Sequence, residues 1–375
     1  MNKYAYLTVL FVLSAVSQNS FSKNIFNAAF TNDIARVAEL ISQNKNVVNE
    51  RDDIGCTPIH YAAVKGCTEA VALLIEKGAN INERNDGGWA PIHFAGVKGD
   101  TEAIALFIEN GANVNERGDG GWTPIHYAAE QGYTEAIALL IEKGANVNER
   151  NDIGCTPIYY AVTQGHTEAA ALLIEKGANV NERNDDGCTP IHFAGVKGHT
   201  EAIALLIENG ANVNERNDIG WAPIHCAAVK GYTEAIALLI ENGANPNASH
   251  EDVSALRIAV YHNDHDTVVE LFESADIDVN QRDLALVDAA TEGYLEIVKV
   301  LLEAGAQPTR KDWCGFSARH YANKNGHKEV AKLIKSYEPI TLGHLLVLGG
   351  AVVGGGIVAS YLIKNGCNFL YGKKV

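Results

Sequence analysis

Histidine is the residue type in this sequence with the clearest capacity for chemistry, and five of its thirteen copies recur in one motif. The motif first appears as TPIHYAA at residues 57–63, and later copies begin at Ala90, Thr123, Thr156, Thr189 and Ala222, always 33 residues apart. Its histidines are His60, His93, His126, His192 and His225, and Tyr159 takes this place in the remaining copy. A metal site or an acid–base pair needs several groups that converge on one point. One imidazole per copy instead indicates a row of separate structural positions.

The only dense patch of metal-binding residue types is HNDHD at residues 262–266. The HxxH spacing of His262 and His265 on a turn could hold a metal, but a structural or solvated role is favoured. The sequence has no CxxC pair, no HExxH motif, no glycine-rich phosphate loop and no recognisable pair of nucleophile and base. We therefore predict that the protein is not an enzyme and has no cofactor, metal or small-molecule substrate.

The seven cysteines are an odd number, and three of them occupy the same position of their repeats. These are Cys56, Cys155 and Cys188, each directly before a copy of the motif. Cys56 has no cysteine at the equivalent position of the next copy, so adjacent repeats cannot pair all of them. This arrangement favours free thiols over a disulfide framework.

A fixed period of 33 residues is typical of a solenoid, in which each repeat buries its apolar face only against its neighbours. Within one repeat, the polar and glycine-containing stretch 49–55 predicts a turn or hairpin. Thr57 and Pro58 suit the N-cap and first position of a helix that runs to about Lys65. A second helix, with an apolar stripe at helical spacing, is expected from Thr68.

The TPIHYAA motif, the GxTEAxALLIExGANxN continuation and the 33-residue period resemble the ankyrin-repeat family. The resemblance covers about residues 24–337. It implies an all-α fold: a curved solenoid of stacked helix pairs with β-hairpin fingers, in which the motif histidine has a structural hydrogen-bonding role. The repeats are expected near 24–49, 50–82, 83–115, 116–148, 149–181, 182–214, 215–247, 248–280, 281–309 and 310–337. The shortened finger near Arg282 should interrupt the finger row.

The regular repeats differ mainly at the fingers and at the end of the first helix. The residue before the motif is always cysteine or tryptophan, and the helix ends vary from Val64-Lys65 to Glu130-Gln131. The resemblance implies that these columns lie on a concave surface that reads a partner protein. The predicted protein-binding residues are Cys56, Val64, Lys65, Trp89, Lys98, Trp122, Glu130, Gln131, Cys155, Cys188, Trp221 and Lys230. The tryptophans are expected to be exposed anchors; neutral variation, with each tryptophan flat on its own finger, is the alternative.

The two ends of the chain predict export and membrane anchoring. Residues 1–22 combine a positive start, an apolar run of 12 residues and small polar residues, as in a signal peptide. Residues 340–363 contain no Asp, Glu, Lys or Arg and are long enough to span a bilayer as a C-terminal hydrophobic helix. Gly350 and Gly354 form a small-xxx-small pattern that allows close helix packing, and residues 364–375 are a short basic tail. The alternatives are terminal segments packed on the first and last repeats.

Charge separates the end of the chain from the rest. The net charge of −16 argues against nucleic acid as a partner, because phosphate binding needs a basic face. Residues 310–375 carry a net charge of +7, so the preceding chain carries −23. Lys324, Lys328, Lys332 and Lys335 lie at helical spacing and could rest on anionic lipid headgroups or simply face solvent.

From these patterns we expect an exported, single-pass, membrane-anchored scaffold that binds an unidentified protein. Leaders of this kind resemble those of exported ankyrin proteins of host-associated bacteria, which rests on analogy alone. The alternatives are a soluble cytosolic adaptor or a host-directed effector without a membrane span, whether secreted or cytoplasmic. A third is an oligomeric membrane assembly held together by the glycine-rich span.

Overall fold

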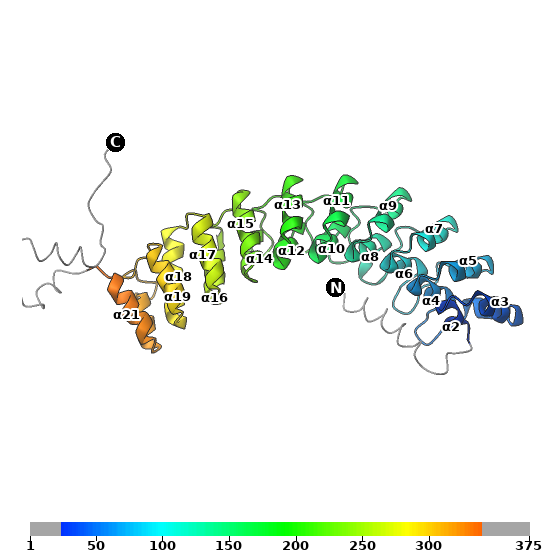
Figure 1. Cartoon of the computed structure of the whole chain (residues 1–375), viewed down its shortest axis with the longest axis horizontal. Helices are drawn as coiled ribbons and strands as arrows, with labels where there is room; N and C mark the ends of the chain where they lie inside the picture. Colours follow the sequence, from blue (N-terminus) through cyan, green and yellow to red (C-terminus); the bar gives the residue numbers. More distant parts are fainter. Residues whose placement is uncertain (1–23, 340–375) are drawn as a thin grey trace, which may run out of the picture.

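The computed structural model describes residues 24–339, which form ten helix pairs stacked in one curved row. The first helix of each pair is called the inner helix and the second the outer helix; from α6 and α7 to α16 and α17 the inner helices lie on the concave side of the row and the outer helices on the convex side (Figure 1). The pairs, numbered 1 to 10 as repeats, are α2 (Ile25–Phe30) and α3 (Ile34–Gln43), α4 (Pro58–Lys65) and α5 (Thr68–Glu76), α6 (Pro91–Lys98) and α7 (Thr101–Glu109), α8 (Pro124–Gln131) and α9 (Thr134–Glu142), α10 (Pro157–Gln164) and α11 (Thr167–Glu175), α12 (Pro190–Lys197) and α13 (Thr200–Glu208), α14 (Pro223–Ala228) and α15 (Thr233–Glu241), α16 (Ala255–Tyr261) and α17 (His265–Ser274), α18 (Val279–Glu292) and α19 (Leu295–Glu303), and α20 (Ala318–Lys324) and α21 (Lys328–Tyr337).

The motif builds the inner helix as predicted. In repeat 2, Thr57 is the N-cap of α4 in extended conformation, and Pro58 takes the first helical position, where its missing N–H has no partner to lose. Gly66 ends the helix with φ of +77°, a left-handed conformation that a side chain would strain. The outer helix α5 then starts at Thr68, so both predicted helix boundaries are confirmed.

Small residues let neighbouring inner helices approach closely. Ala62 and Ala63 are fully buried where α4 meets α6. At Gly96 of α6, an added Cβ would lie 2.8 Å from the Pro124 carbonyl oxygen of α8, so a side chain here would push the two helices apart. The outer helices complete the core with residues such as Leu74, which is also fully buried. One continuous apolar core therefore runs along the whole row.

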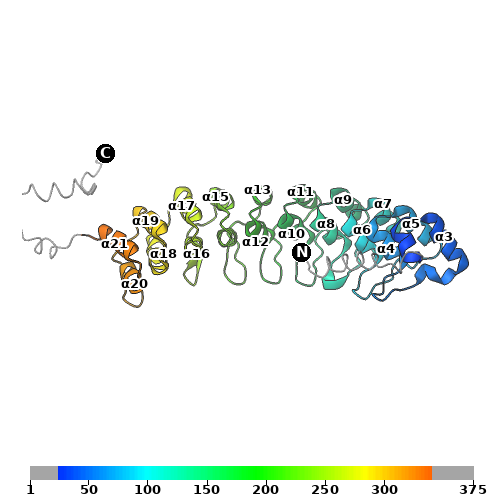
Figure 2. The ribbon, with the colours of Figure 1, turned by 60° about the horizontal axis from the view of Figure 1, so that its bottom comes forward.

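The fingers are mostly tight loops rather than the β-hairpins that the sequence predicted. In repeat 3, the Asn85 amide donates to the Trp89 carbonyl at 2.9 Å, and the Asn85 side chain accepts from the Trp89 amide at 2.9 Å. Such side-chain bonds close the loop without a strand ladder. In the described chain only β1 (Ser249–His250) and β2 (Val253–Ser254) form a paired hairpin. Short 3₁₀ turns occur at Lys45–Asn49 and Asp119–Gly121. The finger loops project to one side of the inner helices (Figure 2).

Repeat 9 has no finger, which confirms the predicted interruption of the finger row. Its inner helix α18 begins at Val279 and extends through the place of the finger. Polar side chains make the connection instead. The buried Asp283 carboxylate accepts from the Gln307 amide at 2.6 Å and from the Arg310 guanidinium at 3.0 Å.

Several predictions concern residues outside the described range. These are the signal peptide 1–22, the hydrophobic helix 340–363 with Gly350 and Gly354, and the tail 364–375. Among residues 24–339, no helix combines the length and the apolar character needed to cross a membrane.

Candidate functional site

The prediction that the finger tryptophans are exposed is wrong for Trp89 and Trp122, which are only 2% and 3% exposed. Their rings pack against aromatic residues of the inner helices of their own and the following repeat. The Trp89 ring lies 4.6 Å from that of Tyr127, and the Trp122 ring lies 4.1 Å from that of Tyr160, measured between centroids. Each tryptophan therefore packs on an aromatic residue of the following repeat. Trp221 is half-buried and stacks on His225.

The cysteines of the same column are also interface residues. Cys56 is fully buried, Cys155 is 3% exposed, and Cys188 is half-buried. In the next repeat, the Asn85 side-chain amide lies 3.3 Å from the Cys56 sulfur. Burial raises the pKa of Cys56 to about 12 and that of Cys155 to about 11, so both remain neutral thiols at physiological pH. This column connects repeats, and Cys56, Trp89, Trp122 and Cys155 present no surface to a partner.

The motif histidines have the structural role that the resemblance implied. In repeat 4, His126 Nδ1 accepts from the Thr123 amide at 3.1 Å, and Nε2 lies 3.2 Å from the Cys155 carbonyl of the next repeat. The imidazole thus caps its own helix and binds the following finger. Burial lowers the pKa of His60 and His126 to about 4, and it also lowers that of His93, His192 and His225.

The tyrosine substitution in repeat 5 shows which part of this role is essential. The Tyr159 hydroxyl donates to the Glu182 carbonyl at 2.6 Å and also to the Cys188 carbonyl. Tyrosine therefore keeps the bond to the next repeat and loses only the helix cap. Because phenol replaces imidazole without loss of this contact, the contact is structural.

The HxxH patch at residues 262–266 lies at the turn between α16 and α17. His262 and His265 are both exposed, and His265 Nδ1 lies 3.2 Å from an Asp266 carboxylate oxygen. Within the described residues, no three His, Cys, Asp or Glu side chains are grouped closely enough to hold a metal ion.

The C-terminal ends of the inner helices form an exposed row on the concave side. Of the predicted residues, Lys65, Lys98, Gln131 and Lys230 are exposed there. Val64 and Glu130 instead are 7% and 5% exposed, and burial raises the pKa of Glu130. The other exposed members of the row are Gln164 and Lys197. The row thus has lysines at both ends and glutamines in the middle.

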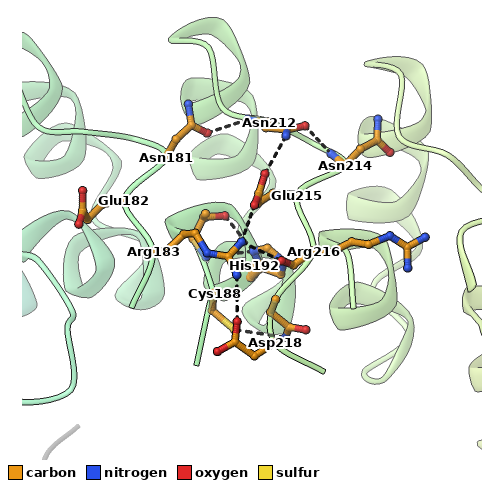
Figure 3. Close-up of polar contacts among 12 residues, drawn as sticks. Asn181, Glu182, Arg183, Cys188, His192, Asn212, Asn214, Glu215, Arg216 and Asp218 are labelled. Carbon is orange, nitrogen blue, oxygen red and sulfur yellow. Dashed lines mark hydrogen bonds and ion pairs between the residues drawn. The ribbon is translucent and has the colours of Figure 1, made fainter. Parts of the chain in front are cut away.

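The fingers are joined by a ladder of ion pairs along their outer edge (Figure 3). Arg183 pairs with Glu215 and with Asp218, the latter at 3.0 Å, and it also donates to the Arg216 carbonyl at 2.8 Å. Arg51, Arg117 and Arg150 make the same contacts in their repeats. At Arg216 the pattern changes, because this side chain donates to the carbonyl of Ser249. Each exposed pair contributes about 1 kcal/mol or less, so the ladder mainly fixes the spacing of the fingers.

A second ladder, made of asparagine side chains, joins each repeat to the loop that follows the outer helix of the next repeat. The Asn181 side chain donates to the Gly210 carbonyl at 2.8 Å and accepts from the Asn212 amide at 2.9 Å (Figure 3). The same pair of bonds recurs at Asn115, Asn148 and Asn214. The two ladders hold the concave side in one conformation, which lowers the ordering cost of binding a partner.

The sequence placed the column of Ile153 and Ile219 on the variable, partner-reading surface, but the predicted binding residues left out these exposed apolar side chains and Tyr261. Ile153 and Ile219 at the finger tips are 58% and 59% exposed, and Tyr261 at the end of α16 is 78% exposed. Ile153 and Ile219 belong to a column that changes from repeat to repeat, and this variability was the signal available. Tyr261 replaces the valine of the helix-end column.

Comparison with known proteins agrees with the stacked helix pairs. A family model described as ankyrin repeats (3 copies) matches residues 25–118, 98–184, 181–250 and 256–343. Among solved structures, the human ASB11 ankyrin repeat domain is similar, with a TM-score of 0.55 and 27% sequence identity. That similarity covers 59% of this chain and 98% of the other.

Proposed function

Because this chain belongs to the ankyrin-repeat family, we propose that it is a non-catalytic scaffold that binds a protein along its concave face. The observation that carries the proposal is the exposed helix-end row, held at fixed spacing by the two ladders. Because the frame is rigid, a partner binds without ordering the backbone and loses only the freedom of side chains such as the lysines. The buried tryptophans have no place in this proposal.

The concave face offers two different chemistries. The helix-end row carries Lys65, Lys98, Lys197 and Lys230, which make no ion pair with the described residues. The finger tips carry the exposed Ile153 and Ile219, each directly after a carboxylate, Asp152 or Asp218, that the arginine ladder already pairs. The partner that fits best has acidic groups opposite the lysines and an apolar surface opposite the finger tips.

Charge reversal on the row tests this surface. We expect Lys197→Glu with Lys230→Glu to raise the Kd for the partner by about tenfold or more, since charge reversal in an interface costs over about 1.4 kcal/mol. The matched control is Lys143→Glu with Lys176→Glu, which makes the same change at the ends of outer helices α9 and α11. Proteins that the wild-type chain and the control capture, but that the Lys197→Glu, Lys230→Glu variant does not, are the candidate partners whose Kd is then measured by titration. Equal affinity of both variants would contradict the assignment.

We also propose that residues 1–22 direct export and that residues 340–363 anchor the chain in a membrane. The support is the composition of both segments, apolar and almost uncharged, at the two ends of the solenoid. The host-directed effector, the soluble adaptor and the oligomeric assembly through Gly350 and Gly354 remain alternatives. The vesicle experiment described below distinguishes an anchored chain from a peripheral one.

A further inference from the structure

The last repeat has an end face that points away from the rest of the stack, and earlier repeats show which positions form it. In repeat 2, the Thr68 hydroxyl lies 3.1 Å from the Asp100 carboxylate of repeat 3, so this position faces the following repeat. Ala72 and Ile75 lie four and seven residues further along α5, on the same side of the helix. Thr68 and Ile75 are half-buried, whereas Ala72 between them is exposed. Thr68 and Ile75 therefore lie against the next outer helix, and Ala72 lies on the same side of α5 at the edge of that contact.

In repeat 10 the same three positions are all lysine. Counted from the glycine that ends each inner helix, the equivalents of Thr68, Ala72 and Ile75 in α21 are Lys328, Lys332 and Lys335. All three are exposed. Three like charges on this surface exclude another apolar repeat, and they place a strip of cations across the end of the solenoid.

The finger of repeat 10 extends the same face. Lys311 stands in the column of Arg51, whose side chain reaches forward to Glu83 and Asp86 of the next repeat. Phe316 stands in the column of Cys56, is 43% exposed, and stacks on His320 at 4.2 Å between ring centroids.

At the tip of this finger, Trp313 is 95% exposed, the opposite of Trp89 and Trp122. Tryptophan, with one apolar ring and one N–H donor, suits the headgroup region of a membrane.

Nearby carboxylates do not neutralise this end face. Glu329 occupies the column of Glu69, which accepts from Asn32 of the preceding repeat at 2.9 Å and therefore points backward. Glu338 pairs with Arg319 at 2.8 Å. Asp312 is held inside its finger by the Tyr321 hydroxyl at 2.5 Å and by two backbone amides. Asp312 and Glu329 offset part of the charge of Lys311, Lys328, Lys332 and Lys335, so the end face keeps a net positive charge on an otherwise acidic protein.

We propose that this end face binds anionic lipid headgroups, so that the solenoid stands on the membrane and its concave face stays accessible. The charge of the face selects an anionic surface. Helix α21 ends at Tyr337, and the uncharged segment 340–363 begins three residues later in the sequence. The choice of a membrane as the occupant rests on the anchor proposed above.

The test uses the full chain with vesicles of phosphatidylcholine, with or without phosphatidylglycerol. We expect brominated lipids to quench tryptophan fluorescence in the anionic vesicles only, and Trp313→Phe to abolish the quenching. Lys328→Gln with Lys332→Gln and Lys335→Gln should abolish it as well. For any chain bound peripherally, this variant should lower partition onto anionic vesicles roughly a hundredfold, since each lysine contributes about fivefold. The matched control is Lys98→Gln with Lys197→Gln and Lys230→Gln, which removes the same charge from the concave face and should leave quenching unchanged.

A carbonate wash separates the two proposals. In one outcome the chain stays on the vesicles after the carbonate wash, but its tryptophan fluorescence is quenched equally with and without phosphatidylglycerol, or equally in the triple Lys→Gln variant. This outcome overturns the end-face proposal and supports the anchor. In another outcome the chain binds only vesicles that contain phosphatidylglycerol, carbonate removes it, and the triple Lys→Gln variant does not bind. This outcome supports the end-face proposal and shows that the anchor is wrong. A third outcome is that sedimentation without lipid shows self-association that the triple Lys→Gln variant loses, while lipid charge has no effect on quenching. The face would then bind another copy of the protein, and the proposal would fail.

Discussion

Replacing Trp89 with alanine is expected to lower the free energy of unfolding by about 3–5 kcal/mol, the usual cost of removing a large buried aromatic side chain. Its ring packs at the interface of two inner helices, against Phe94 of α6 at 4.9 Å and Tyr127 of α8 at 4.6 Å, between centroids. A solenoid gains its stability from contacts between neighbouring repeats, so a cavity at this interface weakens the coupling of repeats 3 and 4. Urea denaturation followed by circular dichroism measures the effect.

The matched control is the same substitution at an exposed tryptophan. Trp313→Ala, at a side chain 95% exposed, should change the free energy of unfolding by no more than about 0.5 kcal/mol. If Trp89→Ala left stability intact and instead weakened partner binding, the packing described here would be wrong and Trp89 would be a contact residue after all.

Mild acid is expected to destabilise the solenoid through its buried histidines. The pKa of His60 and His126 is about 4 in the folded chain, against about 6.5 when unfolded. Between these values the unfolded chain binds protons that the folded chain does not, so stability falls as the pH drops below about 6.5. Above that pH the contribution is fully present. At pH 5, His60 and His126 each lower the free energy of unfolding by about 2 kcal/mol relative to neutral pH, and the three other motif histidines act in the same direction.

The chain supplies its own control for this effect, because Tyr159 replaces the histidine in repeat 5. His126→Tyr should keep the bond to the next repeat, as the Tyr159 hydroxyl does, and remove one titrating group. The loss of stability between pH 7 and pH 5, measured by urea denaturation, should then be smaller by about 2 kcal/mol than in the wild-type chain. An unchanged loss would show that His126 is not among the groups responsible.

The repeat period determined most of what could be predicted about the fold. Helix boundaries such as Thr57, Pro58 and Gly66 follow from local chemistry that recurs in each repeat, and they were predicted correctly. The fingers were predicted as β-hairpins, but asparagine or aspartate side chains close most of them as loops. The missing finger of repeat 9 was visible as a shorter repeat, whereas its replacement by an extension of α18 was not.

The candidate site was harder to predict because variability was taken as a sign of exposure. The column of Trp89 and Cys56 varies, yet it lies between repeats, so its side chains meet protein rather than solvent. The Trp89 ring packs on Tyr127, and the Cys56 sulfur lies against the side-chain amide of Asn85. A single sequence cannot separate variation at such a buried interface from variation at a binding surface. The columns of Lys65 and Ile153 vary too, and only the structure shows that their side chains reach solvent.

Photo-crosslinking in living cells tests most directly whether the concave face holds the partner. A photoreactive residue at position 131 or 197, at the ends of inner helices, should form a specific covalent adduct. The same residue at position 142 or 175, at the ends of outer helices α9 and α11, should not. All four positions are exposed, so exposure alone cannot produce a difference. Adducts from the outer-helix positions, with none from the concave row, would contradict the proposed scaffold surface.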